Sequence, residues 1–233
     1  MSFTGLVFLL IFIIQLFTLA YFSKILQQRL GTFFYHHTGS QKTAVIFLAI
    51  LFFPGTLIHE LAHAITAGVL MVAVGEIELM PEIRENGIKL GSVQIAKTDP
   101  FRKALIGVAP VLFGLSLLLG IAYYLTSNLS QSAGIPYLVW ILIFYLVFVI
   151  TSTMFSSPKD LEGTFAVSVF ILAIFTAFYL LKYQFVFDFL GYLINIKGVE
   201  FLQKSVALLS LPVIVDLVVL GIIKLIMPKR HSF

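Results

Sequence analysis

The chain has 233 residues, of which 60% are hydrophobic and only 11% are charged. Soluble domains carry roughly 25% charged residues, so this composition and the mean hydropathy of +1.05 exclude an ordinary soluble protein. The absence of cysteine excludes disulfides, thiolate metal sites and a cysteine nucleophile. We therefore expect a single integral-membrane domain over residues 1–233.

The net charge of +4 does not point to nucleic acid. The 15 Lys and Arg residues are scattered along the chain, and no basic stripe with interleaved aromatic residues occurs. We expect the lipid bilayer as a partner and no nucleic acid, and we expect the basic residues to set the orientation of the loops.

Apolar segments predict an all-α polytopic membrane protein with about six transmembrane helices. The expected helices are Thr4–Phe22, Thr43–Val74, Phe101–Thr126, Tyr137–Phe155, Thr164–Leu181 and Val199–Met227. Each is long enough to cross the hydrocarbon core at ~1.5 Å per residue. The first helix follows no basic residue and has too long an apolar core for a secretory signal, so we expect it to be retained.

Polar residues between and within these helices have structural interpretations. Lys24–Lys42 is expected to be a polar link, with His36 and His37 on a solvated loop. Asp216, in the last expected helix, is a candidate for substrate binding or for pairing with Lys224.

The expected second helix carries the motif His59-Glu60-Leu61-Ala62-His63. Positions four apart lie about 40° apart around a helix, so the two histidines point the same way from consecutive turns. Imidazole is a good zinc ligand, and a catalytic zinc has three protein ligands and an open position for water. Glu60 would lie beside the metal, where it can accept a proton from water and pass it to a leaving amine. The motif therefore predicts a zinc metalloprotease.

The setting of the motif favours this function. No charged residue occurs from Phe47 to Pro54 or from Ala64 to Val74, and ionisable groups in membrane segments are costly and usually functional. The alternative is a pair of buried histidines bonded to each other or to the backbone. Just before the motif, Pro54-Gly55 predicts a kink in the helix.

Residues 75–99 break the helical pattern. Glu76–Met80 alternates polar and apolar residues, Glu85-Asn86-Gly87 supplies a turn, and Ile88–Ala96 alternates again. The pattern predicts a small β-hairpin at the membrane surface. Its exposed edge could take an extended peptide as an added strand, and the alternative is a plain amphipathic linker.

A second polar turn follows the expected fourth helix. Within Ser156–Gly163, Asp160 and Glu162 are the only carboxylates between Asp99 and Asp188, which makes them a source of a third metal ligand. The alternative is that Asp160 caps the next helix. Alternating spans make the second and fourth helices parallel, so motif and turn approach the same side of the bilayer. Loop charges, with the C-terminal end counted beside the hairpin, favour the cytoplasmic side.

These features together resemble the site-2 protease family of intramembrane zinc metalloproteases. The resemblance lies in the motif from His59 to His63, the hairpin-like segment and the acidic turn two helices later, with a core at about residues 43–163. The chain is most similar to the divergent, compact branch of the family. That similarity implies Asp160 as the third ligand, and Glu162 in Leu161-Glu162-Gly163 is the second choice.

The resemblance implies hydrolysis of a peptide bond, in or near the bilayer, of a membrane-embedded protein or peptide substrate. It implies Zn²⁺ on His59, His63 and Asp160, with Glu60 as general base. The compactness of the chain suits a prokaryotic plasma membrane. The alternative is a non-proteolytic membrane protein, either a degenerate protease scaffold or a metal-ion transporter, although no internal repeat typical of transporters occurs.

Overall fold

The structure is a computed structural model that describes residues 3–84, 87–127, 136–155, 169, 173–174, 176–178, 180–181 and 196–226. Its helices are α1 (Phe3–Thr38), α2 (Gln41–Val69), α3 (Pro100–Ser127), α4 (Tyr137–Thr153) and α7 (Ile196–Ile226). Its strands are β1 (Val74–Glu78), β2 (Glu82–Arg84), β3 (Gly87–Lys89) and β4 (Ser92–Ile95). The chain is mostly helical with one small hairpin, which confirms the helical character and the hairpin of the predicted fold but not its six spans.

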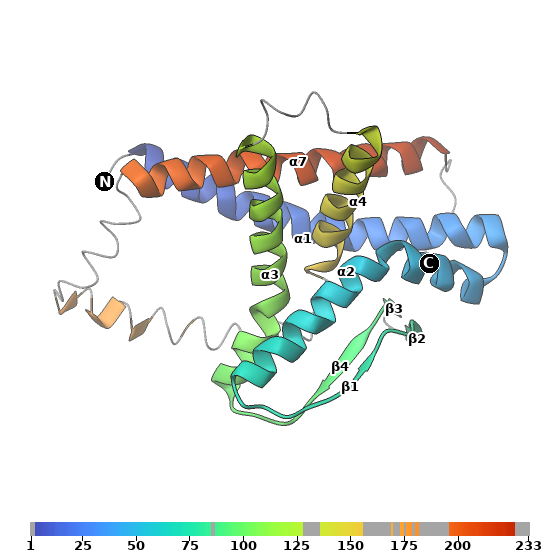
Figure 1. Ribbon diagram of the computed structural model, residues 1–233, viewed down its shortest axis with the longest axis horizontal. Coiled ribbons are helices and arrows are strands. Elements are labelled where there is room, and N and C mark those ends of the chain that lie inside the picture. Colours follow the sequence, from blue (N-terminus) through green and yellow to red (C-terminus); the bar gives the residue numbers. More distant parts are fainter. Residues whose placement is uncertain are drawn as a thin grey trace.

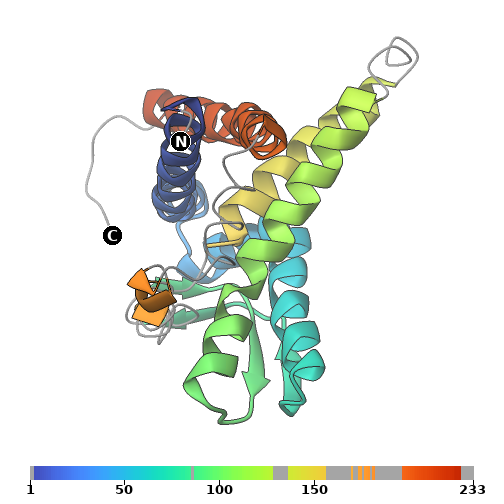
Figure 2. The same ribbon diagram turned by 90° about the vertical axis from the view of Figure 1, so that its left-hand side faces the viewer.

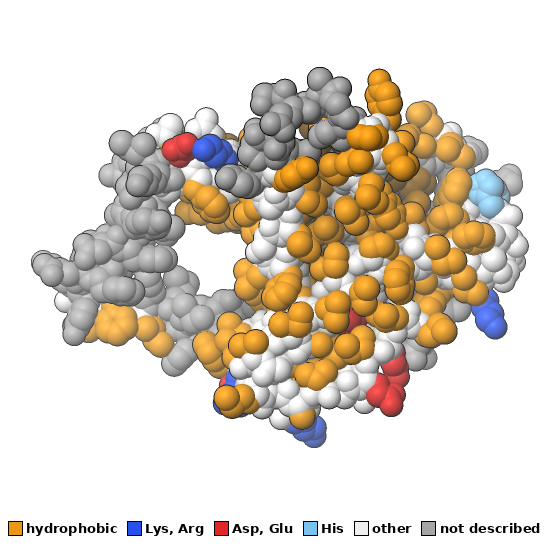
Figure 3. Space-filling model, viewed as in Figure 1, with side chains coloured by type: hydrophobic (Ala, Val, Ile, Leu, Met, Phe, Trp, Pro, Cys, Tyr) orange, Lys and Arg blue, Asp and Glu red, His pale blue; other side chains and the backbone are white. Residues whose placement is uncertain are grey.

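Four of the helices are long and apolar enough to cross a membrane, namely α1, α2, α3 and α7. The fifth, α4, is apolar but has only 17 residues. Hydrophobic side chains cover most of the described face in Figure 3, and charged side chains lie mainly at its margins. Exposed apolar surface of this extent is suited to lipid, so the structure supports an integral-membrane protein.

The first and last helices lie side by side and run in the same direction (Figure 1). The Gln15 amide of α1 donates hydrogen bonds to Val206 O and Ser210 Oγ of α7, both at 3.1 Å. Further along both helices, Leu30 and Ile223 share one buried cluster. Six alternating spans would make the first and last helices antiparallel. The structure therefore does not support six spans, nor the placement of the C-terminal end beside the hairpin, and most of the expected helix Thr164–Leu181 lies outside the described residues.

The predicted polar link at Lys24–Lys42 is wrong, because α1 continues without a break to Thr38. Ser23, Leu26 and Leu30 are buried at helical spacing against the rest of the molecule, while Lys24 lies on the exposed face. The polar residues are thus the outer face of a continuing amphipathic helix. Only Gly39, with φ of +64°, and the residue after it separate α1 from α2.

The proline of α2 lies inside a continuous helix. Pro54 has no N–H and pushes against the preceding turn, which weakens the hydrogen bonds of that turn. The Tyr145 hydroxyl of α4 donates to Leu51 O at 2.8 Å and so satisfies one carbonyl of the disturbed turn. Neighbouring helices commonly repair proline sites in membrane segments in this way.

The helices α2 and α4 pack closely and run in the same direction, as predicted. Successive contacts join Leu51 to Tyr145, Phe52 to Phe148, and Gly55 to Val149. A Cβ added at Gly55 would lie 2.6 Å from Val149 Cγ1 and 2.7 Å from Val149 O. The missing side chain of Gly55 is therefore what allows the two backbones to approach.

The C-terminal half of α4 forms the centre of the bundle. All seven residues from Val147 to Thr153 are buried, since α1, α2, α3 and α7 all contact α4. Figure 2 shows α3 and α4 side by side, with α1 and α7 seen nearly end-on beside them. Ser23 Oγ and Gln27 Nε2 of α1 each donate to Ser152 O at 2.6 Å, so α1 caps the last turn of α4.

The predicted hairpin is confirmed. The strands β1 and β4 pair antiparallel, with Ile77 opposite Val93, and β2 pairs with β3 towards the turn. Three residues, 79–81, lie opposite only two, 90–91, because Glu78 pairs with Ser92 and Glu82 with Lys89. This unpaired interruption divides the hairpin into two short ladders, and the register of the first ladder also shifts by one residue between Val74 and Ile77.

The contact at Gly55 yields a prediction about stability. Gly55→Ala should destabilise the protein by about 1–3 kcal/mol, because the new methyl group must displace Val149. The matched control is Gly120→Ala in α3, where an added Cβ meets nothing within 4 Å. The thermal unfolding midpoint in detergent should fall for the first variant only. Equal midpoints would show that α2 and α4 do not depend on this approach.

Candidate metal centre

The helix α2 holds the three motif residues in the interior. His59, Glu60 and His63 have exposed fractions of 5%, 6% and 4%. They lie one turn after the close contact of Gly55 with α4, where the hairpin, α3 and α4 all pack against α2. Polar groups this buried in a membrane helix require partners.

The two histidines face each other through the nitrogens that bind metals. Nε2 of His59 and Nε2 of His63 are 3.2 Å apart, and the ring planes meet at 81°. Two nitrogens on one tetrahedral zinc, each at ~2.0–2.1 Å from the ion, lie about 3.3 Å apart. The spacing therefore fits two ligands of one zinc ion without rearrangement, and it also fits a single hydrogen bond between the rings.

The other nitrogen of His63 is held by α3. Nδ1 of His63 lies 2.8 Å from the carbonyl oxygen of Ile106. Because a carbonyl only accepts, the proton must lie on Nδ1, which leaves the lone pair on Nε2 to face His59. Metal-binding histidines usually donate their second N–H to a carbonyl or carboxylate in this way.

The start of α3, which supplies Ile106, is fixed by its own cap. Asp99 Oδ1 accepts from the backbone N–H of Phe101 at 3.1 Å and of Arg102 at 3.0 Å. The hydrogen bond from the Arg102 backbone holds the pKa of the Asp99 carboxyl below its usual value, and the Arg102 charge adds to this effect. A lowered pKa means that the cap stabilises the fold at neutral pH and loses this effect as the pH falls through the folded-state pKa.

The hairpin covers Glu60 through a glycine that the sequence interpretation did not single out as a site residue. A Cβ added at Gly91 would lie 2.7 Å from Thr56 Cγ2 and 3.3 Å from Glu60 Cγ. The backbone before β4 therefore rests directly on the turn of α2 that carries Glu60. An isolated glycine within a strand pattern indicates such a close approach, so this signal was present in the sequence.

The predicted third ligand cannot be placed beside the histidines, because both Asp160 and Glu162 lie outside the described residues. The alternative role of Asp160 as a helix cap lies outside them too. No group of three or more His, Asp or Glu residues that could hold a metal ion occurs in the part of the chain that the structure describes. The end of α4 is nevertheless close to the motif, since Thr153 Oγ1 is the nearest atom to a Cβ added at Gly55, one helical turn before His59.

The other candidate residues lie elsewhere. His36 and His37 are exposed, as expected, but they belong to the last turn of α1 rather than to a loop. Asp216 is fully buried, and its carboxyl oxygens have no hydrogen-bond partner among the described atoms. The predicted pairing of Asp216 with Lys224 is wrong, because Lys224 is exposed two turns further along α7.

The histidine geometry yields a prediction about metal binding. Loss of a group that only hydrogen bonds to a metal ligand and orients it weakens metal binding by roughly 10–100-fold. His59→Ala and His63→Ala each remove a proposed ligand itself, so each should weaken zinc binding by more than this. His37→Ala, which removes an exposed histidine of α1, should bind zinc like the unmodified protein. Zinc per chain and affinity can be measured on the detergent-purified protein. Equal zinc binding by all of these proteins would mean that the facing rings are only a hydrogen-bonded pair.

No protein-family model, curated protein or solved structure matches this chain. The assignment of function therefore rests on the motif and on the geometry around it.

Proposed function

We propose that the protein is an intramembrane zinc metalloprotease, similar to the site-2 protease family, which hydrolyses a peptide bond of a membrane protein in or near the bilayer. The observation that carries this proposal is the facing pair of Nε2 atoms, 3.2 Å apart on a buried helix. The Ile106 carbonyl strengthens the proposal, because it accepts a hydrogen bond from His63 and so orients the ring, as groups behind a metal ligand commonly do.

The third ligand in this proposal is Asp160, with Glu162 as the second choice. Support comes from the direction of α4, which runs parallel to α2 and ends at Thr153, whose hydroxyl is the nearest atom to a Cβ added at Gly55, one turn before His59. The chain thus leaves α4 at the level of the motif, and Asp160 follows Phe155 by only five residues. Five extended residues span at most about 17 Å, and this length limits how far Asp160 can be from Phe155.

The protein side chains would divide the chemistry between them. Bound at His59 and His63, zinc supplies Lewis-acid activation of water and of the scissile carbonyl. Glu60 accepts the proton of the attacking water and later donates it to the leaving amine. The packing of Gly91 on Thr56 and Glu60 keeps bulk water away from the face of α2 that carries the Glu60 carboxyl group.

The substrate would bind in an extended form. A transmembrane helix hides its carbonyls in internal hydrogen bonds, so a segment must unwind before its peptide bond can be attacked. The hairpin offers support for such a segment, because β1 is exposed along its whole length and pairs only with β4 among the described strands. Its outer edge can hydrogen bond to an added strand.

Substitution of the proposed base separates hydrolysis from metal binding. Glu60→Gln should keep one zinc per chain and lower the cleavage rate by about 10²–10⁴-fold, because the amide cannot accept the proton. Cleavage can be measured by labelling the new N-termini that the purified protein produces in a reconstituted membrane proteome. Full activity of Glu60→Gln would contradict the proposal. Weak zinc binding together with zinc flux into liposomes would instead identify a metal-ion transporter.

A further inference from the structure

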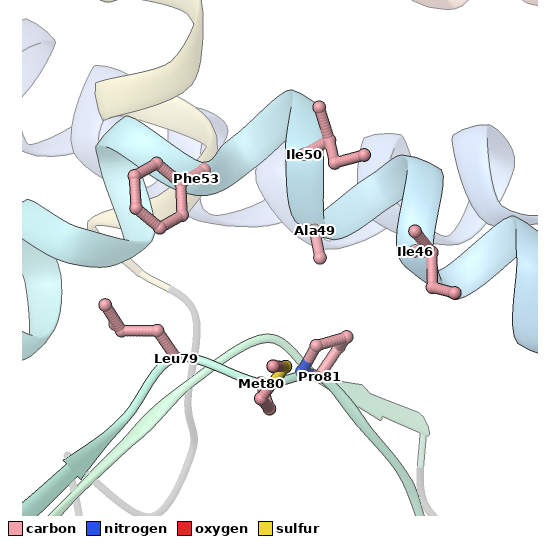
Figure 4. A pocket seen from close by; sticks show the side chains of 7 residues that line it. All are labelled: Ile46, Ala49, Ile50, Phe53, Leu79, Met80 and Pro81. Atoms are coloured by element: carbon pink, nitrogen blue, oxygen red, sulfur yellow. The ribbon is translucent and has the colours of Figure 1, made fainter.

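An apolar groove of about 580 Å³ lies between α2 and residues 79–81, which separate the two ladders of the hairpin (Figure 4). On the helix side it is lined by Ile46, Ala49, Ile50 and Phe53. Three of these side chains are widely exposed, with Ile46 at 44%, Ile50 at 66% and Phe53 at 47%. The volume is in the range of small-molecule and peptide side-chain pockets.

The groove continues directly into the candidate site. At 100° per residue, Ile46, Phe53 and Glu60 fall on one stripe of α2, because each follows the last by seven residues, about two turns. The stripe is exposed at Ile46 and Phe53 and buried at Thr56 and Glu60, where Gly91 covers it. The groove is therefore the open end of the surface that leads to the proposed base.

The opposite wall is formed by Leu79, Met80 and Pro81. These three residues lie between the two ladders of the hairpin and take no part in either ladder. Pro81 has no N–H to donate, and Met80 is 82% exposed. The wall thus combines apolar side chains with backbone groups of residues 79 and 80 that are outside the strand ladders, which suits an extended polypeptide better than an acyl chain.

We propose that this groove is a specificity subsite, which binds apolar side chains of an extended membrane-protein segment on one side of the cleaved bond. The inference rests on the proposed protease function. Phe53 lies about 10 Å and Ile46 about 21 Å from Glu60 along the helix. At ~3.3 Å per extended residue, the groove receives the side chains about three to six residues from the bond.

The absence of cysteine makes the inference testable by cross-linking. Ile50→Cys places a thiol in the groove, and Leu112→Cys, on α3, places one at a residue that is 54% exposed and does not line the groove. Both are made in the Glu60→Gln full-length protein. The probe is a 20-residue Leu/Ala peptide with flanking lysines, a central Asn-Pro that weakens its helix, and one cysteine moved along it.

The expected result is a disulfide at Ile50→Cys that peaks when the peptide cysteine is three to six residues to one side of the bond cut by the unmodified protein. At Leu112→Cys the yield should be low and independent of position. Cross-linking that is equal at the two sites overturns the subsite. So does a co-purified phospholipid that is lost in Ile50→Asn and that the peptide does not displace.

A kinetic measurement distinguishes this inference from the proposed function. Ile50→Asn should raise KM for the same peptide by about 10-fold and leave kcat unchanged, while Leu112→Asn changes neither. Cleavage of the peptide with no effect of Ile50→Asn overturns the subsite and leaves the protease assignment standing. Position-dependent cross-linking of a peptide that the unmodified protein never cuts would leave the groove as a peptide-binding site only, and would overturn both its role beside a cleaved bond and the protease assignment.

Discussion

The close approach of α2 and α4 at Gly55 is the contact on which the arrangement of the candidate site depends. It lets α4 lie in the middle of the bundle with seven successive residues buried, and it brings Thr153, the last residue of α4, against α2 one turn before His59. A second glycine, Gly91, lets the hairpin approach the same helix from another side. The histidines and Glu60 are thus enclosed because Gly55, on their own helix, and Gly91, in the hairpin, lack a side chain.

The sequence was sufficient to predict a mostly helical membrane protein with a small hairpin, because apolar segments of membrane length and an alternating strand pattern are strong local signals. It was insufficient wherever polar residues lie on an exposed helical face. Lys24 suggested the end of a helix, yet Ser23, Leu26 and Leu30 continue a buried stripe past it. The parallel packing of α1 and α7 was also unpredictable, because these helices are apolar on most sides, so periodicity does not specify which face meets which partner.

The motif part of the candidate site could be predicted because the spacing of His59 and His63 alone sets both rings on one side of a helix. The carbonyl of Ile106 could not, since a backbone group 43 positions away has no signature in the sequence. Gly91 could have been found from its place in a strand pattern. The parallel course of α2 and α4 followed from alternation and is present in the structure, whereas Asp160 and Glu162 lie beyond the described residues.

The cap that α1 places on α4 has a consequence for genetics. Ser23 and Gln27 are more than 120 positions from Ser152, whose carbonyl they hold, and neither residue belongs to the motif. Their hydrogen bonds hold the last turn of α4. In the sequence, this turn comes just before the segment Ser156–Gly163, which carries Asp160 and Glu162. If the protein has the proposed activity, a random screen for inactive alleles should therefore recover substitutions in α1 as well as in the histidine motif, and changes at the end of α4 should suppress the substitutions in α1.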